Sequence, residues 1–206
     1  MPANQSVTQQ SEGLRSIESA AQLIAAHQPR RKLLRRMLAR CAVALFLHEE
    51  QRDGVAVLMI RRAERAGDPW SGHMAFPGGR RERADRNTLA TALRETHEEV
   101  GFDAAGSARL LGRLSDIATR PGRKGGPMII TPYVFGLESA PALTPNGEVA
   151  ETVWVPLTFL ADRGNREKMR WAPNGVPLEL PCYLFGGRRI WGLSLMMLDE
   201  LVAALG

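Results

Sequence analysis

Residues 78–101, GGRRERADRNTLATALRETHEEVG, constrain the fold more than any other stretch of the chain. Two glycines come first, and Leu89, Leu93, Thr96 and Val100 then recur at the spacing of one helix face. The apolar segment GHMAFP before the glycines is typical of a strand. We therefore expect a strand that runs into a glycine turn, followed by a helix that packs its apolar face on a sheet.

Other apolar runs extend this sheet. The runs at 41–50 and 54–63 flank a short polar connection, which predicts a hairpin. Further strands are expected within 108–119, 128–137, 150–162 and 169–185, the third leading into a short helix and the last containing an Asn-Gly turn. Helices are expected at 14–29, where Pro29 ends the helix, and at 192–205. The predicted fold class is α/β, in the α+β sense, with a mixed central sheet.

The size of the chain and its N-terminus limit its class. Its 206 residues fit one domain with extensions. No apolar run approaches the roughly 18 residues that a membrane span needs, and MPANQSVTQQSEGLRS has neither a basic start nor an apolar signal core. We therefore expect a cytoplasmic protein with no membrane partner. Cys41 and Cys182 lie in apolar surroundings without CxxC spacing, as buried thiols do.

The net charge of +5 is compatible with a nucleic acid or with a small anionic substrate. One basic cluster, PRRKLLRRMLAR at 29–40, has leucines and a methionine at helical spacing, so a solvated amphipathic helix explains it. The chain lacks the aromatic platform of a single-strand binder and the spacing of a zinc finger. These features argue against nucleic-acid binding as the main function.

Three glutamates lie close together near the end of the predicted helix. Glu95, Glu98 and Glu99 share one helix face, where like charges repel each other by a few tenths of a kcal/mol per pair. A hard divalent cation such as Mg²⁺ takes oxygen ligands and would neutralise them. A solvated acidic face is the alternative, but the neighbouring glycines, which let a ligand approach the backbone closely, favour the cation.

The same stretch resembles the Nudix box, the sequence pattern of the Nudix hydrolase family. Arg94, Glu95, Glu98, Glu99 and Gly101 match the second half of that pattern. The family usually has a glutamate eight residues before the arginine. This chain has Arg86 there, Asp85 one position earlier, and a spacer that is one residue longer than the common form.

The resemblance implies a Nudix-like α/β/α sandwich at 38–206, preceded by an N-terminal helical leader at 1–37. It also implies a metal site for Mg²⁺ or Mn²⁺ and hydrolysis of a diphosphate bond. Glu98, Glu99 and the Gly78 carbonyl would be metal ligands, and Glu95 would be a ligand or would orient the attacking water. The three glutamates would be catalytic, with Arg94 holding them in place. A further catalytic acid is usually recruited from outside the box, and we expect Glu148 rather than Glu151.

The segments VLMIRRAERAGDPWSGHMAFPGG, EVAETVWVPL and RRIWGLSLMMLDEL resemble the coenzyme A diphosphatase-like branch of the family. This resemblance implies cleavage of coenzyme A or its derivatives to 3′,5′-ADP and phosphopantetheine. Hydrolysis of ADP-ribose or another nucleoside diphosphate derivative is an alternative, as is a non-catalytic Nudix module that binds a nucleotide or RNA. The candidate substrate-binding residues are Arg61, Arg62, Arg65, Arg123 and Lys124. Trp70 would either stack on the substrate or pack. The oligomeric state stays open, with a homodimer among the alternatives.

Overall fold

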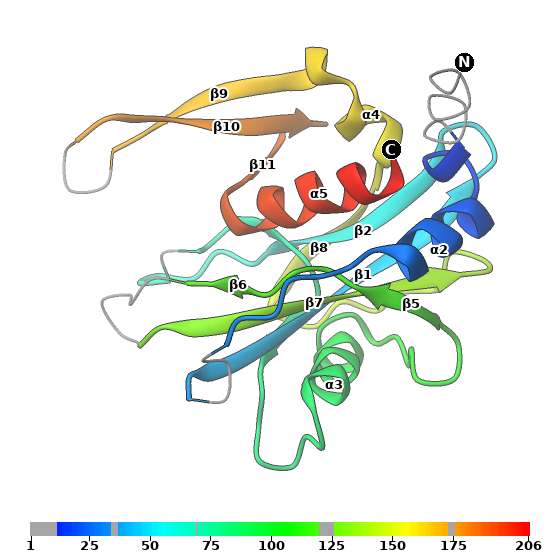
Figure 1. Cartoon of the computed structure of the whole chain (residues 1–206). Coiled ribbons are helices and arrows are strands. Elements are labelled where there is room, and N and C mark those ends of the chain that lie inside the picture. The colour runs from blue at the N-terminus through cyan, green and yellow to red at the C-terminus, as the bar shows by residue number, and fades with distance from the viewer. Residues whose placement is uncertain (1–11, 34–36, 69, 120–125, 173–175) are drawn as a thin grey trace.

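The computed structural model describes residues 12–33, 37–68, 70–119, 126–172 and 176–206 (Figure 1). Its main sheet has eight strands, with β3, β2, β1, β7 and β5 in order and with β4 on β1, β6 on β7 and β8 on β2. Strands β1 and β7 are parallel and the other pairs antiparallel, so the predicted mixed sheet is confirmed. The strands are β1 Ala39–Glu50, β2 Gly54–Arg62, β3 Met74–Ala75, β4 Gly78–Arg80, β5 Arg109–Arg113, β6 Ile117–Ala118, β7 Met128–Leu137 and β8 Val149–Pro156.

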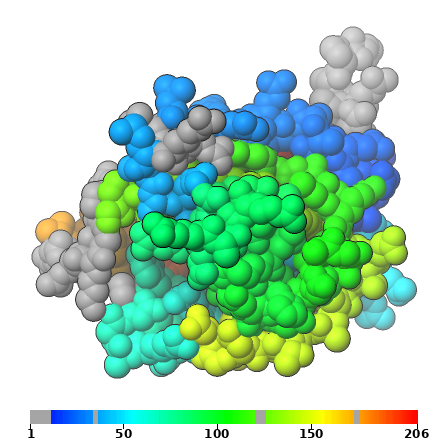
Figure 2. Space-filling model, turned by 90° about the horizontal axis from the view of Figure 1, so that it is seen from below, coloured from blue at the N-terminus to red at the C-terminus, as the bar shows by residue number. Residues whose placement is uncertain are grey.

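Helices cover both faces of this sheet. Helices α2 and α5 lie on one face and α3 on the other (Figure 1). The helices are α2 Ile17–Ala26, α3 Thr88–Val100, α4 Leu157–Ala161 and α5 Gly192–Leu205, with a 3₁₀ turn at Arg163–Asn165. Seen from the α3 side, this helix and the loop before it cover the middle of the surface (Figure 2). The architecture is the expected α/β/α sandwich. None of the helices in the described ranges is long and apolar enough to cross a membrane.

Strand β1 shows why the middle of a central strand is continuously apolar. Leu45 and Leu47 point into the core shared with α2 and α5, whereas Ala44 and Phe46 point into the core under α3. Because successive side chains of a strand alternate between faces, a strand covered on both faces must be apolar at every position. The apolar run at 41–47 therefore follows from the sandwich, and the polar residues at 48–50 lie at the less buried end of the strand.

A second, smaller sheet is built from the C-terminal part of the chain. It contains β9 Arg166–Trp171, β10 Leu178–Phe185 and β11 Arg188–Trp191, all antiparallel. The β9–β10 pair projects beyond the body of the sandwich (Figure 1). The Asn-Gly turn predicted in this region lies outside the described residues.

The segment before β1 is packed into the sandwich. In α2, Ala20, Ala21 and Ile24 are buried in the same core as α5. Just after α2, His27 Nε2 lies 2.9 Å from the Glu200 carboxylate of α5. The structure therefore holds this helix in place by both apolar and polar contacts.

Two local predictions are wrong. Gly78 and Gly79 form strand β4, paired with Val43 and Ala42, rather than a turn. A Cβ atom on Gly78 would overlap the carbonyl oxygen of Ala42, so the strand pairing itself requires glycine.

The segment at 29–40 is not helical in its described part, and β1 begins at Ala39. The side chains of Ser115 and Asp116 accept hydrogen bonds from the backbone N–H groups of Arg30 and Lys32. Leu33 is 99% exposed, so helical periodicity here does not reflect a buried face.

Candidate active site

Helix α3 begins and ends where its sequence indicates. The Asn87 side chain caps the N-terminus by accepting a hydrogen bond of 2.9 Å from the Ala90 N–H. Gly101 ends the helix with a φ of +67°, in the left-handed region that favours glycine. These caps fix the helix ends and so the face that carries the glutamates.

Glu99 is the most buried of the three glutamates, at 5% exposed. Its Oε2 accepts a hydrogen bond of 2.8 Å from the backbone N–H of Gly78. Burial raises the pKa of Glu99 to about 7, and the nearby Glu95 carboxylate contributes in the same direction. The protein thus holds a carboxylate where its charge is unfavourable unless a cation compensates it.

Arg94 connects the acidic residues around it. Its guanidinium donates to Glu98 Oε2 at 2.8 Å and to Glu95 Oε1 at 2.9 Å. A third bond, from Nε, reaches Asp85 Oδ1 at 3.0 Å, and a fourth reaches the Arg80 carbonyl at 3.2 Å. The arginine therefore fixes the positions of Glu95 and Glu98 relative to β4.

Asp85 is a site residue whose role the sequence reasoning missed. It is 6% exposed and also accepts hydrogen bonds from the Thr91 hydroxyl and the Glu82 N–H. These bonds, above all those from Arg94, hold its pKa at about 2. Asp85 therefore supplies the acid that the family pattern places one residue later. The only signal for it was an aspartate beside the expected position.

Gly79 allows the helix to approach the strand closely. A Cβ atom on Gly79 would lie 2.5 Å from the carboxyl carbon of Glu95. Burial raises the pKa of Glu95, although its bond with Arg94 acts in the opposite direction. Strand β4 is thus in contact with Glu95 through one glycine and with Glu99 through the other.

The donor atoms around helix α3 and strand β4 are of the type that binds a hard divalent ion. Glu95, Glu98, Glu99 and the Gly78 carbonyl offer only oxygen atoms, the ligands that Mg²⁺ and Mn²⁺ prefer. Within the described part of the chain, no three His, Cys, Asp or Glu side chains are placed so that they could hold a metal ion together. Glu95 and Glu98 are turned toward Arg94 instead. The donor types fit the ion, and these two side chains would have to rotate to bind it.

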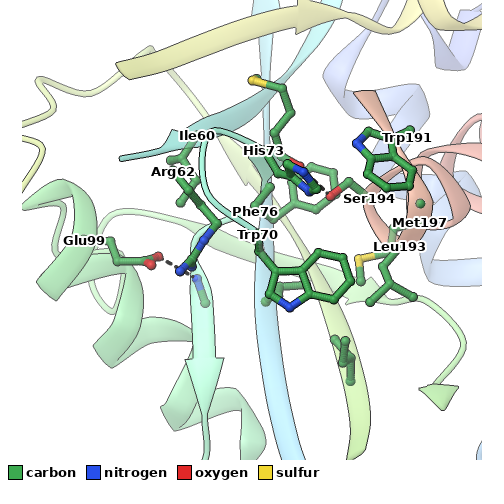
Figure 3. Close-up of a pocket in the computed structure, with 16 residues that line it drawn as sticks. Ile60, Arg62, Trp70, His73, Phe76, Glu99, Trp191, Leu193, Ser194 and Met197 are labelled. Carbon is green, nitrogen blue, oxygen red and sulfur yellow. Dashed lines mark hydrogen bonds between the residues drawn. The ribbon is translucent and has the colours of Figure 1, made fainter. Parts of the chain in front are cut away.

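A cavity of about 280 Å³ opens beside Glu99 (Figure 3). Gly78, Glu99 and Arg62 line one part of it. The Arg62 guanidinium donates to Asp68 Oδ2 at 2.9 Å, and its Nε has no hydrogen-bond partner among the described residues. The remaining walls are mostly apolar and aromatic, and they come from the central strands of the main sheet, from the segment around β3 and from the start of α5. The cavity therefore joins an acidic and basic end to an apolar compartment.

The other predicted basic residues lie apart from this cavity or outside the described residues. Arg61 precedes Arg62 in β2 and points to the opposite face, where it donates to Glu151 at 2.6 Å. Arg188 also donates to Glu151, and together these bonds lower the pKa of Glu151 to about 2. Arg123 and Lys124 lie outside the described residues.

Glu148 and Arg65 form an exposed pair, with NH1 of Arg65 3.0 Å from Glu148 Oε1. The charge of Glu148 contributes to raising the pKa of Glu99, so the two carboxylates lie within electrostatic range of each other. Glu151 is held by two arginines, whereas Glu148 is half-exposed. Its electrostatic effect on Glu99 favours Glu148 over Glu151, which is bonded to Arg61 and Arg188.

The raised pKa of Glu99 predicts a pH-dependent stability in EDTA. Because the folded pKa of about 7 exceeds the ordinary 4.5, the folded state should lose stability as the pH rises through this interval. The loss should be about 3 kcal/mol in the free energy of unfolding, measured by urea denaturation at pH 5 and pH 8. Glu99→Gln keeps an acceptor for Gly78 and should lack this part of the pH dependence. An equal change in the free energy of unfolding between pH 5 and pH 8 in the unmodified protein and in Glu99→Gln would contradict the prediction.

Comparison with known proteins identifies the family. The model of the NUDIX domain matches residues 37–174. Mouse mitochondrial coenzyme A diphosphatase NUDT8 is 30% identical over 146 residues, covering 70% of this chain and 68% of that protein. An uncharacterised Schizosaccharomyces pombe protein, C14C4.10c, is 39% identical over 107 residues, which are 50% of this chain and 32% of that protein. Human NUDT8, at 30% identity, is matched over 60% of its length.

Solved structures agree with this fold. A Nudix hydrolase from Alicyclobacillus acidocaldarius superposes with a TM-score of 0.54 at 17% identity, covering 82% of this chain and 93% of that one. A MutT/nudix family protein from Enterococcus faecalis gives 0.51 at 19% identity, covering 99% and 73%. At these identities the likeness concerns the fold alone. From the domain match and the NUDT8 relatives, the chain belongs to the Nudix hydrolase family.

Proposed function

We propose that this protein hydrolyses the diphosphate bond of coenzyme A or a close derivative in a reaction that depends on Mg²⁺ or Mn²⁺. The observation that carries the proposal is the placement of Glu99, bonded to Gly78, and of Arg62 on the wall of one cavity. An acidic end suits a metal ion, and an adjacent arginine suits a phosphate. A diphosphate would therefore contact the metal ion at Glu99 and the guanidinium of Arg62 at the same time.

The protein's own residues would divide the work. Glu95, Glu98, Glu99 and the Gly78 carbonyl would hold the metal ion, which supplies charge compensation for the diphosphate and a water of lowered pKa. Arg94 would position Glu95 and Glu98, and Asp85 would position Arg94. Arg62 would bind a phosphate oxygen, and Glu148 would accept the proton of the attacking water. No covalent intermediate with the protein is needed.

The substrate is proposed from the relatives. Two NUDT8 proteins and a Caenorhabditis elegans protein, ndx-8, are named as coenzyme A diphosphatases. Arg65 lies beside Glu148 and is available for a second phosphate once that pair opens. The RNA-binding alternative would use the basic segment at 29–40, and the complete set of Glu95, Glu98 and Glu99 argues against it, because a pure binding module does not need a clustered metal site.

Two further expectations remain predictions. The first is a cytoplasmic location, which was expected from the sequence. The relatives are instead named mitochondrial or peroxisomal. A homodimer is the other, to be measured by light scattering.

The proposal is tested by incubating the protein with coenzyme A and Mg²⁺ or Mn²⁺ and identifying the products by mass. We expect 3′,5′-ADP and phosphopantetheine in equal amounts, and none in EDTA. ADP-ribose at the same concentration provides the comparison. Faster cleavage of ADP-ribose would replace coenzyme A as the substrate, and absence of turnover with either would overturn the proposed reaction.

A further inference from the structure

The loop between β2 and β3 is tightly hydrogen-bonded although it carries an exposed tryptophan. Asp68 Oδ1 accepts a bond of 3.0 Å from the Trp70 N–H, and the Ser71 hydroxyl accepts one of 2.7 Å from the Arg65 N–H. The N–H of His73 donates to the Trp70 carbonyl at 3.2 Å. Trp70 itself is 53% exposed. The loop therefore fixes the backbone of a large apolar side chain that is not buried by packing.

Trp70 belongs to a row of rings on the cavity wall. Its ring centroid lies 5.7 Å from that of His73, with the planes inclined by 78°. His73 lies 5.0 Å from Trp191, the residue before α5, at 61°. All three residues line the cavity, and Figure 3 shows them across it from Glu99 and Arg62. We call Trp70, His73 and Trp191 the aromatic wall.

The shape and charge of this compartment limit what it can hold. Its volume of about 280 Å³ is at the lower end of whole-ligand pockets, so it suits one part of a substrate. Leu193 and Met197 of α5 add apolar surface beside the rings. Burial lowers the pKa of His73, which keeps the imidazole neutral near pH 7. The wall therefore offers uncharged ring surfaces close to the charged end of the cavity.

We propose that the aromatic wall binds the nucleobase of the substrate by stacking, with Trp70 as the main contact. The proposal deepens the function proposed above and rests on it for the position of the diphosphate at Glu99 and Arg62. A base is joined to that diphosphate through one ribose, so it would fall within the same cavity. Because Trp70 is 53% exposed and lines the cavity, part of its ring surface is available to a flat π system such as a base.

The test measures binding of three probes in Mg²⁺ by calorimetry. The probes are ADP, methylenediphosphonate, which lacks a base, and phosphopantetheine, which carries the other half of coenzyme A. Trp70→Leu should weaken ADP binding about 10-fold or more, as expected when base stacking is lost, and Trp70→Phe should retain most of it. Binding of methylenediphosphonate should change less than about 2-fold. Leu110→Ala is the control, because Leu110 of β5 is an apolar side chain that is 46% exposed and does not line the cavity.

The outcomes distinguish a failure of base stacking on the aromatic wall from a failure of the proposed hydrolysis of coenzyme A. An equal loss for ADP and methylenediphosphonate, or a loss confined to phosphopantetheine, would overturn stacking of the base. Weakened ADP binding in Trp70→Leu together with no turnover of coenzyme A by the unmodified protein would retain the aromatic wall and reject the substrate. Thermal unfolding of each variant verifies that the exposed substitution leaves the fold intact.

Discussion

Glu99→Gln is expected to reduce turnover of coenzyme A at least about 100-fold, because residues that merely support a metal ligand already contribute 10- to 100-fold. The substitution keeps the size of the side chain and an acceptor for the Gly78 N–H. It removes the charge that would hold the cation beside the cavity. Steady-state rates at saturating Mg²⁺ give the measurement, and Glu98→Gln should cause a loss of similar order.

The control for these variants is Glu179→Gln. Glu179 pairs with Lys168 on the projecting hairpin, with its side chain 61% exposed. Its substitution should leave the rate within about 2-fold, since exposed ion pairs contribute little. Full activity of both Glu98→Gln and Glu99→Gln in folded protein would show that the glutamate face is not the catalytic centre.

Asp85→Asn is expected to have the second largest effect, on stability as well as rate. Asp85 is buried and accepts two bonds from Arg94, which would lose its charged partner. Removing one member of a buried ion pair typically costs 3–5 kcal/mol, and we expect about 3 kcal/mol here because Arg94 keeps its bonds to Glu95 and Glu98. Urea denaturation measures this change. Turnover should fall about 10- to 100-fold as the glutamates lose their fixed arginine.

A matched arginine–carboxylate pair provides the control. Arg166 donates two hydrogen bonds to Asp199, but both side chains are partly exposed, at 33% and 43%. Asp199→Asn should therefore cost no more than about 1 kcal/mol and leave turnover unchanged. If Asp85→Asn proved no more destabilising than Asp199→Asn, the assigned role of Asp85 would be wrong.

The sequence predicted the elements whose signals are local. Helix α3 was expected from its apolar spacing, and the structure places all three glutamates on this helix. Strands β1 and β2 and helix α5 also followed from periodicity. Their formation depends on burying one face or both, which the chain encodes within a dozen residues.

What depends on distant partners was not predictable. Gly78 and Gly79 have the composition of a turn, yet they pair with β1, more than thirty residues earlier. In the periodic segment at 29–40, the backbone N–H groups of Arg30 and Lys32 instead donate hydrogen bonds to the side chains of Ser115 and Asp116. The cavity combines Trp70 with α5, and nothing local to either segment indicates the other.

Gly79 and the loop after β4 have different consequences for how this sequence can change. The carboxylate of Glu95 fills the space where a side chain on Gly79 would be, so that position has no steric freedom. The loop from Arg81 to Arg86 only has to return an acid to Arg94, and here it does so with one residue more than the usual pattern. Length variation can therefore accumulate in the loop without moving the helix relative to the strand. In engineering terms, the loop is the place for insertions, and the strand–helix contact is the part to leave unaltered.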